Sequence, residues 1–313
     1  KAVKLEIIED IPAGKIPIHP LKTGQASRIM TGGVIPEGAD TIIPIEDVLT
    51  SDNSVNVNEV EEIGAHIRKK GEDFSVGNPI LLTGQWLSAG EIAVLATVQQ
   101  SFVTVYRRPR VAIITTGDEL VEIEENVENG KVVNGNTTAL ASFSESCGAE
   151  AIMLPIARDR PADIKRTIEE ASDADFILSS GGVSVGDFDY VKQVLQEMGA
   201  KTLFWRVAMK PGKPLLFCKL NSTPYFGLPG NPVSSMISFL QFVRPALYKA
   251  AGHLPNRWIL PETIASLNNN VFNEGDRRNY VRCKLQYDYN GDLNASVFAQ
   301  QGSHMVSSMI SAN

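Results

Sequence analysis

The stretch Ser179–Tyr190 reads SSGGVSVGDFDY, and it decides the fold that we expect. It begins directly after the apolar run FIL at 176–178 and precedes Val191, Val194 and Leu195, which recur at helical spacing. An apolar run followed by glycines and then by an amphipathic pattern predicts a strand, a glycine turn and a helix. This order is the repeating unit of a parallel sheet covered by helices.

The glycines of this turn also suggest chemistry. Gly181, Gly182 and Gly186 allow backbone N–H groups to approach an anion closely, and the start of the helix adds the positive end of its dipole. Asp187 and Asp189 would repel a bare phosphate but accept one that carries a divalent cation. The turn therefore predicts a metal–phosphate site. A glycine turn that serves only close packing would show the same pattern, so that alternative stays open.

Two later stretches are of the same kind. Met209–Pro214 reads MKPGKP, which places Lys210 and Lys213 around a Pro-Gly turn where both can reach one anion. Gly227–Ser234 reads GLPGNPVS, and its Asn231 is the expected N-cap of a following helix. In an open α/β sheet such loops meet beyond the carboxyl ends of the strands. We therefore expect one shared site.

Acidic residues follow two other expected strands. The first strand ends in TTGDEL, which supplies Asp118 and Glu119, and the second ends in ARDRP, which supplies Asp159. Each of these could be no more than a helix N-cap. Taken together, Glu119, Asp159, Asp187 and Asp189 predict an acidic flank opposite the two lysines of MKPGKP.

The composition sets limits on the class of protein. With 313 residues, 43% hydrophobic and 21% charged, the chain is expected to be a soluble, multidomain, cytoplasmic protein. Its net charge of -7 argues against a general nucleic-acid surface, and the absence of a long apolar run argues against a membrane span. Cys147, Cys218 and Cys283 stand far apart, which favours core residues over a metal site.

We expect an α/β plus β architecture in which a central doubly wound α/β domain lies between a β-rich domain and a small C-terminal β-barrel-like domain. The expected parts are a linker or dimerisation layer at 1–20 and 84–109, the β-rich domain at 21–83, the α/β domain at 110–252 and the C-terminal domain at 253–313. The C-terminal domain carries a hairpin signal at Asn290-Gly291 and is expected to be incomplete.

The motifs RIMTGG, TGDEL, ARDRP, GGVSVG, KPGKP, LPGNPVS and QGSH occur in the order typical of one family. From Lys1 to Asn313 the chain resembles the molybdopterin molybdotransferases, the MoeA and gephyrin E-domain family. The resemblance implies a Mg²⁺-dependent transferase that inserts molybdate, or tungstate in its place, into adenylylated molybdopterin and releases AMP. It also implies a homodimer, with a molybdopterin adenylyltransferase as the enzyme of the preceding step.

The resemblance further implies roles for single residues. The catalytic set is Glu119, Asp159, Asp189, Lys210 and Lys213, with Asp159 and Asp189 as the Mg²⁺ ligands. The substrate-binding set is Thr31, Asn136, Gly181, Gly182, Ser184, Gly186, Pro214, Pro229, Gly230, Asn231, Ser234, Arg277 and Ser303, with Thr31 serving the partner's site. Two departures from the family are visible. The SAMDGYA motif expected at the start does not occur in the sequence, and RRNY stands at 277–280 where relatives have RPEF or RLDF.

Two other functions remain open. A gephyrin-like scaffold would bind peptides, and it predicts an exposed apolar groove. A nucleotide enzyme similar to the molybdopterin adenylyltransferases would use the α/β domain alone, although such enzymes usually carry GGTG where this chain has GGVSVG. Neither function involves nucleic acid or a membrane.

Overall fold

The computed structural model describes residues 2–59, 61–183, 190–273 and 275–312. Four residues of the central motif with expected roles, Ser184, Gly186, Asp187 and Asp189, lie outside the described residues. The chain divides into two compact units, unit 1 at Lys1–Ile80 and unit 2 at Leu81–Asn313, and each has its own fold.

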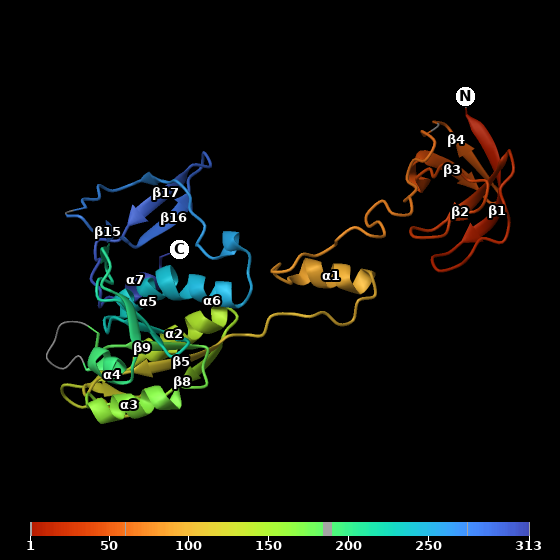
Figure 1. Cartoon of the computed structure of the whole chain (residues 1–313). Helices are drawn as coiled ribbons and strands as arrows, with labels where there is room; N and C mark the ends of the chain where they lie inside the picture. The colour runs from red at the N-terminus through yellow and green to blue at the C-terminus, as the bar shows by residue number, and fades with distance from the viewer. Residues whose placement is uncertain (1, 60, 184–189, 274, 313) are drawn as a thin grey trace. The chain divides into compact units, whose positions relative to one another are not determined.

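Unit 1 is a small β unit (Figure 1). Its four-stranded sheet has the order β2-β1-β4-β3, formed by β1 (Val3–Ile11), β2 (Gln25–Ile29), β3 (Val48–Ser51) and β4 (Ser54–Val57). The sequence placed residues 1–20 in a layer with 84–109. That layer stays a prediction; within unit 1, β1 pairs in parallel with β2 along one edge and antiparallel with β4 along the other.

The first helix of unit 2 is α1 (Ala89–Thr97). Its start is fixed by a capping box, in which Glu91 accepts hydrogen bonds from the hydroxyl and the backbone N–H of Ser88. These bonds, above all the one from the hydroxyl, lower the pKa of Glu91 to about 2.

A six-stranded sheet forms the centre of unit 2, with the order β10-β12-β13-β9-β5-β8. The strands are β5 (Arg110–Thr115), β8 (Glu150–Met153), β9 (Phe176–Ser180), β10 (Lys201–Trp205), β12 (Leu216–Leu220) and β13 (Thr223–Leu228). Strands β13, β9, β5 and β8 are mutually parallel, as predicted. Strand β12 runs against β13 and β10 runs against β12, so β10 points in the same direction as the four parallel strands.

Helices cover both faces of this sheet (Figure 1), which confirms the doubly wound architecture. One face carries α3 (Pro161–Glu170) and α4 (Val191–Glu197). The other carries α2 (Gly135–Ser146), α5 (Pro232–Ser238) and α6 (Arg244–Ala250), with the π-helical segment η2 (Phe239–Val243) between the last two.

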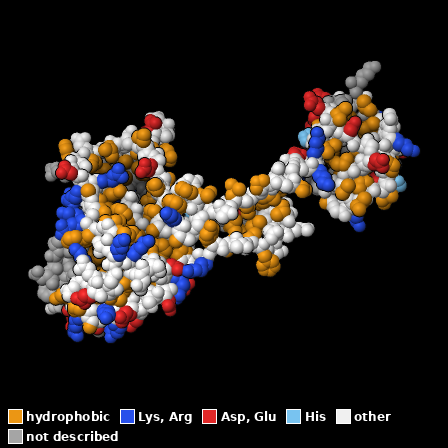
Figure 2. All heavy atoms as spheres, viewed as in Figure 1, with side chains coloured by type: hydrophobic (Ala, Val, Ile, Leu, Met, Phe, Trp, Pro, Cys, Tyr) orange, Lys and Arg blue, Asp and Glu red, His pale blue; other side chains and the backbone are white. Residues whose placement is uncertain are grey.

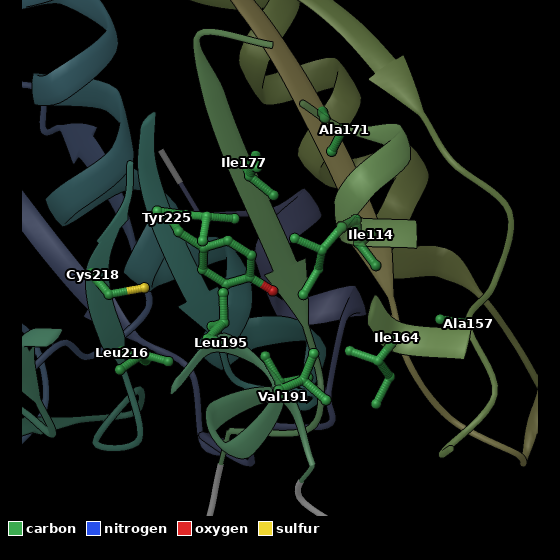
Figure 3. Close-up of a cluster of buried hydrophobic side chains, with 14 of the residues drawn as sticks. Ile114, Ala157, Ile164, Ala171, Ile177, Val191, Leu195, Leu216, Cys218 and Tyr225 are labelled. Carbon is green, nitrogen blue, oxygen red and sulfur yellow. The ribbon is translucent and has the colours of Figure 1, made fainter. Parts of the chain in front are cut away.

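The alternation of side chains along β5 produces two cores. Ala112 and Ile114 point into the core under α3 and α4, whereas Val111 and Ile113 point into the core under α2, α5 and α6. Figure 3 shows the first core, in which the aromatic ring of Tyr225 lies among aliphatic side chains from several strands and helices. Burial on both faces explains why the parallel strands are almost wholly apolar.

The C-terminal region of unit 2 is a three-stranded sheet of order β14-β17-β16. Its strands are β14 (Ser266–Leu267), β16 (Cys283–Tyr287) and β17 (Leu293–Val297), and the predicted turn at Asn290-Gly291 joins the last two. A parallel pair of short strands, β11 (Met209–Lys210) and β15 (Arg278–Asn279), attaches this region to the α/β part. The remaining short elements are η1 (Ile45–Asp47), β6 (Leu120–Val121), β7 (Val132–Val133), η3 (Pro255–Arg257) and α7 (Ser307–Ile310).

Among the described residues, no helix combines the length and the apolar character that a membrane crossing requires. Cys147 and Cys218 are buried as predicted, while Cys283 is half-buried, and all three are free thiols.

Candidate active site

The loops that carry the expected chemistry lie at one edge of the sheet. Because β5, β8, β9 and β13 are parallel, the segments that follow them leave the sheet at the same end. Backbone hydrogen bonds continue across these loops, from Thr116 N–H to Ser180 O (3.1 Å) and from Gly181 N–H to Leu228 O (3.2 Å). The edge is therefore an ordered surface that the strands position directly.

The glycine turn packs tightly against the first loop. Gly181 has φ +98°, and a Cβ there would lie 2.7 Å from the carbonyl oxygen of Thr116. Gly182 has φ +65°, and a Cβ there would lie 2.5 Å from Cγ2 of Val191. The close-packing interpretation of these two glycines is thus supported by direct contacts, and it is compatible with a ligand on the exposed side of the turn.

Gly181→Ala is expected to destabilise unit 2 by about 2–4 kcal/mol, because the methyl group meets a backbone oxygen at a left-handed φ. The measurement is urea unfolding followed by tryptophan fluorescence, since Trp86, Trp205 and Trp258 all lie in unit 2. Gly130→Ala is the matched control, because Gly130 also has a positive φ but has open space around its Cβ position. Equal losses in the two variants would contradict the close-contact argument.

The carboxylates of Asp118 and Asp159 hold two of the loops together. The backbone N–H of Asp118 donates to Oδ2 of Asp159 (3.1 Å), and the backbone N–H of Asp159 donates to Oδ1 of Asp118 (3.3 Å). The N-cap of α3 is Arg160, so Asp159 is not the helix cap that remained an alternative for it. Asp118, which had no predicted role of its own, becomes the second carboxylate of this pair.

Other predicted residues lie around these loops. The carboxylate of Glu119 folds back over Gly117, where a Cβ would be 2.7 Å from Oε2. Asn136 donates from Nδ2 to Gly230 O (2.7 Å) and to Ser180 Oγ (2.8 Å). Asn136 and Gly230 therefore support the glycine turn from the neighbouring strand end.

Further along the same border of the protein lies a second group, which we call the cation pocket. It is a cavity of about 390 Å³ between the MKPGKP turn and the C-terminal region. Its lining residues are Lys210, Pro211, Gly212, Lys213, Pro214, Ser234, Arg277, Asn279, Tyr280, Val281, Arg282, Gln301, Gly302 and Ser303. Figure 2 shows Lys and Arg side chains gathered near β15, at this part of unit 2. Several residues that the sequence assigned to substrate binding thus share one cavity.

The cation pocket is strongly unbalanced in charge. Lys210, Lys213, Arg277 and Arg282 line it without any lining carboxylate. Within the described ranges, no Asp or Glu forms an ion pair with any of these four residues. Clustered cations without counter-charges bind anions, because an anion relieves their mutual repulsion and replaces lost hydration.

Arg282 is the fourth cation of the pocket, and it is not among the site residues expected from the sequence. Its side chain is 4% exposed, and it donates to Ser308 Oγ (3.0 Å) and Gly302 O (3.0 Å). Burial lowers the pKa of its guanidinium. In the local sequence, only the position of Arg282 between the apolar residues Val281 and Cys283 indicates that its side chain is buried.

The two groups share an edge but not a cavity. Asp159 and Glu119 do not line the cation pocket. Lys213 precedes β12 and Asp118 follows β5, and the strands β13 and β9 lie between β12 and β5, which places β12 and β5 about 14 Å apart in the sheet. Thr31 belongs to unit 1, where it is exposed in the turn after β2.

The possible metal ligands in the described ranges are few. No group of three or more His, Cys, Asp or Glu side chains within those ranges is close enough to hold a metal ion. The Asp118–Asp159 pair supplies carboxylate oxygens from two loops, which is the kind of incomplete set that Mg²⁺ completes with water and substrate phosphates. The residues present therefore fit Mg²⁺ better than a metal that needs a full protein cage.

Comparisons with known families cover almost all of this architecture. Residues 112–249 match a probable molybdopterin binding domain, residues 2–98 match the MoeA N-terminal region (domain I and II), and residues 265–313 match the MoeA C-terminal region (domain IV). The second match includes both unit 1 and α1. The third match includes the C-terminal residues that line the cation pocket.

Individual relatives agree with these matches. A molybdopterin molybdenumtransferase of Nostoc is 40% identical over 89% of this chain and 65% of its own length, and one of Haemophilus influenzae is 34% identical over 92% and 71%. The chain thus spans about two thirds of the length of these relatives. A crystal structure of the molybdopterin biosynthesis MoeA protein of Pyrococcus horikoshii is 29% identical, covers 100% of this chain and 76% of that one, and superposes with a TM-score of 0.81. From its sequence matches and its fold, the chain belongs to the MoeA family.

Proposed function

We propose that the protein is a molybdopterin molybdotransferase, which inserts molybdate into adenylylated molybdopterin and releases AMP. The observation that carries this proposal is the cation pocket, which lies at the same sheet edge as the glycine turn and the Asp118–Asp159 pair. Insertion of an oxyanion into a nucleotide conjugate requires one place for a free dianion and another for the phosphate-linked substrate. The edge supplies a cationic place and an acidic place.

Different residues of the chain bind the oxyanion and the metal–phosphate part of the substrate. Lys210, Lys213 and Arg277 donate hydrogen bonds to the molybdate oxygens, while Arg282 contributes a fixed positive charge at the base of the pocket. Pro214, Ser234 and Ser303 complete the lining and shape it. In the acidic place, Asp159 would hold Mg²⁺ together with Asp189, which lies outside the described residues, and Asp118 fixes the loop of Asp159 through its backbone N–H. A bound Mg²⁺ would supply neutralisation of the negative charge that develops as the bond to AMP breaks.

The cation pocket also discriminates between the candidate functions. Its lining comes from the MKPGKP turn, from α5 and from the C-terminal region, so it extends beyond the α/β part. A nucleotide enzyme that used the α/β domain alone would have no need of residues 277–303. For the peptide-binding scaffold, a pocket lined by four cations is chemically unsuited to an apolar ligand.

The assembly is part of the same proposal. Unit 1 exposes large apolar side chains, among them Ile16 at 79%, Ile18 at 78% and Ile63 at 84%. Exposed side chains of this kind support self-association, and the proposed assembly is a homodimer in which Thr31 serves the partner's site. A molybdopterin adenylyltransferase is the proposed source of the substrate.

The test is an assay of AMP release from adenylylated molybdopterin by the full-length protein. We expect release that requires both molybdate and Mg²⁺, and tungstate to replace molybdate as a tetrahedral dianion of similar charge. AMP release at the same rate without any oxyanion would indicate a hydrolase and would overturn the proposal.

A further inference from the structure

One of the four cations that line the cation pocket differs from the other three in its exposure. Lys210, Lys213 and Arg277 are exposed to solvent. Arg282 lines the same cavity but is almost completely buried. Water and dissolved salt screen an exposed charge, whereas a buried charge acts through a medium of lower effective dielectric constant. At an equal distance from a bound anion, Arg282 therefore interacts with it more strongly than an exposed cation does.

Hydrogen bonds fix the position of Arg282. Its Nε donates to Ser308 Oγ and its Nη2 donates to Gly302 O, each at 3.0 Å. The backbone is held as well, because Arg282 N–H donates to Gln301 Oε1 (2.9 Å) and Gln301 Nε2 donates to Arg282 O (2.9 Å). All of these partners are neutral. The bonds therefore orient the guanidinium without cancelling its charge.

The charge of Arg282 has no counter-charge in the protein around it. Within the described ranges, Arg282 forms no ion pair with Asp or Glu, and no described carboxylate lines the cavity. A buried charge without a partner is unfavourable, since it has lost hydration that nothing replaces. An anion in the cavity supplies the missing counter-charge. A dianion supplies twice as much as a monoanion of the same size.

Arg282 also helps to hold the wall of the cavity. Its bond to Gly302 O fixes one side of the loop that carries Gly302 and Ser303. On the other side, the backbone N–H of Val233, in the first turn of α5, donates to Ser303 O (3.0 Å). The wall is thus formed before a ligand arrives. Anions of the same size and shape are therefore expected to occupy the same position, and to differ in affinity mainly through their charge.

We propose that Arg282 is the residue through which the cation pocket selects doubly charged tetrahedral oxyanions over singly charged ones of the same shape. This inference rests on the proposed function, because it specifies the charge of the oxyanion that the transferase accepts. The three exposed cations attract anions in general, and Arg282 adds the discrimination between charges. The competing explanation is that Arg282 only holds the Gly302 loop, in which case its replacement weakens the binding of both kinds of anion alike.

Binding calorimetry on the full-length protein separates these explanations, with molybdate as the dianion and perrhenate as the monoanion. Both are tetrahedral oxyanions of similar size, and they differ by one unit of charge at neutral pH. We expect the wild-type protein to bind molybdate about 30-fold more tightly than perrhenate, and Arg282→Gln to reduce this preference about tenfold. Arg277→Gln is the matched comparison. It removes an exposed arginine of the same pocket, so it should change the preference by less than about threefold.

Two further measurements test the role of the buried charge. Arg282→Lys keeps the charge but loses the planar group that bonds to Ser308 and Gly302, so it should weaken both anions and retain the preference for molybdate. In the wild-type protein, the preference should persist as ionic strength is raised, because salt screens a buried charge less than an exposed one. This last measurement needs no variant, so it tests the inference even if Arg282→Gln does not fold.

Several results would overturn the inference. The wild-type protein could bind the two anions equally tightly or bind neither, or its preference for molybdate could disappear as salt is added. A folded Arg282→Gln protein that keeps the full preference, with both anions weakened alike, would show that the residue serves the loop alone. None of these measurements needs turnover, so failure of the proposed function would show separately, in the AMP-release assay.

Discussion

Lys213→Gln is expected to lower kcat/KM for molybdate by about 10- to 100-fold, because one charge-assisted hydrogen bond contributes about 1.5–3 kcal/mol. Lys213 is exposed at the mouth of the cation pocket and forms no ion pair with a described residue, so its replacement leaves no buried charge behind. The loss of kcat/KM should therefore reflect weaker binding of the anion and not a change in the fold. Steady-state AMP release at varied molybdate concentration measures it.

The matched control is Lys219→Gln, since Lys219 is an exposed lysine on the adjoining strand β12 and does not line the pocket. Wild-type affinity for molybdate should also fall as salt is added, and the fall should be shallower in the Lys213 variant. An unchanged molybdate KM in Lys213→Gln, together with normal stability, would remove the pocket from the mechanism.

Asp159→Asn is expected to lower kcat by about 10²–10³-fold and to raise the Mg²⁺ concentration needed for half-maximal activity. In the wild-type protein the backbone N–H of Asp118 donates to the Asp159 carboxylate at 3.1 Å. Asparagine keeps an oxygen that can accept this hydrogen bond, so the substitution removes the charge and retains the loop geometry. The variant thus isolates the electrostatic contribution of the carboxylate. AMP release titrated with Mg²⁺ is the measurement.

Asp163→Asn provides the comparison for this second prediction. Asp163 lies in the first turn of α3, four positions beyond Asp159, where it pairs with Arg166 at 3.3 Å on the surface. Its loss should change stability only slightly and should leave the Mg²⁺ dependence untouched. If the two variants show the same Mg²⁺ titration as the wild type, Asp159 does not serve the metal.

The sequence predicted the central part of the fold because the signals there are local. Each apolar strand of the parallel sheet is followed by glycines or acidic residues and then by a helical pattern. The antiparallel arrangement of β10 and β12 was not predicted, because an apolar strand gives no sign of its direction. The membership of β1 in unit 1 depends on partners that lie up to about fifty residues away in the chain.

The residues of the acidic loops and those of the cation pocket could be predicted from the sequence to different extents. The lysines of MKPGKP were expected to act together from their spacing alone, and they do line one cavity. Arg277 and Ser303 came only from the family resemblance, since nothing in the local sequence links them to that turn. The burial of Arg282 could not be predicted from the local sequence, because it is created by Ser308 and Gly302, which follow it by more than a complete hairpin.

The attachment of β15 to β11 has a consequence for how the protein is made. The walls of the cation pocket come from the turn around Lys210 and from residues as far along the chain as Ser303, and the short parallel ladder holds these walls together. A growing polypeptide on the ribosome can complete its parallel sheet long before residue 303 emerges. The cation pocket is therefore completed only after residue 303 has been made, later than the sheet that carries its other wall.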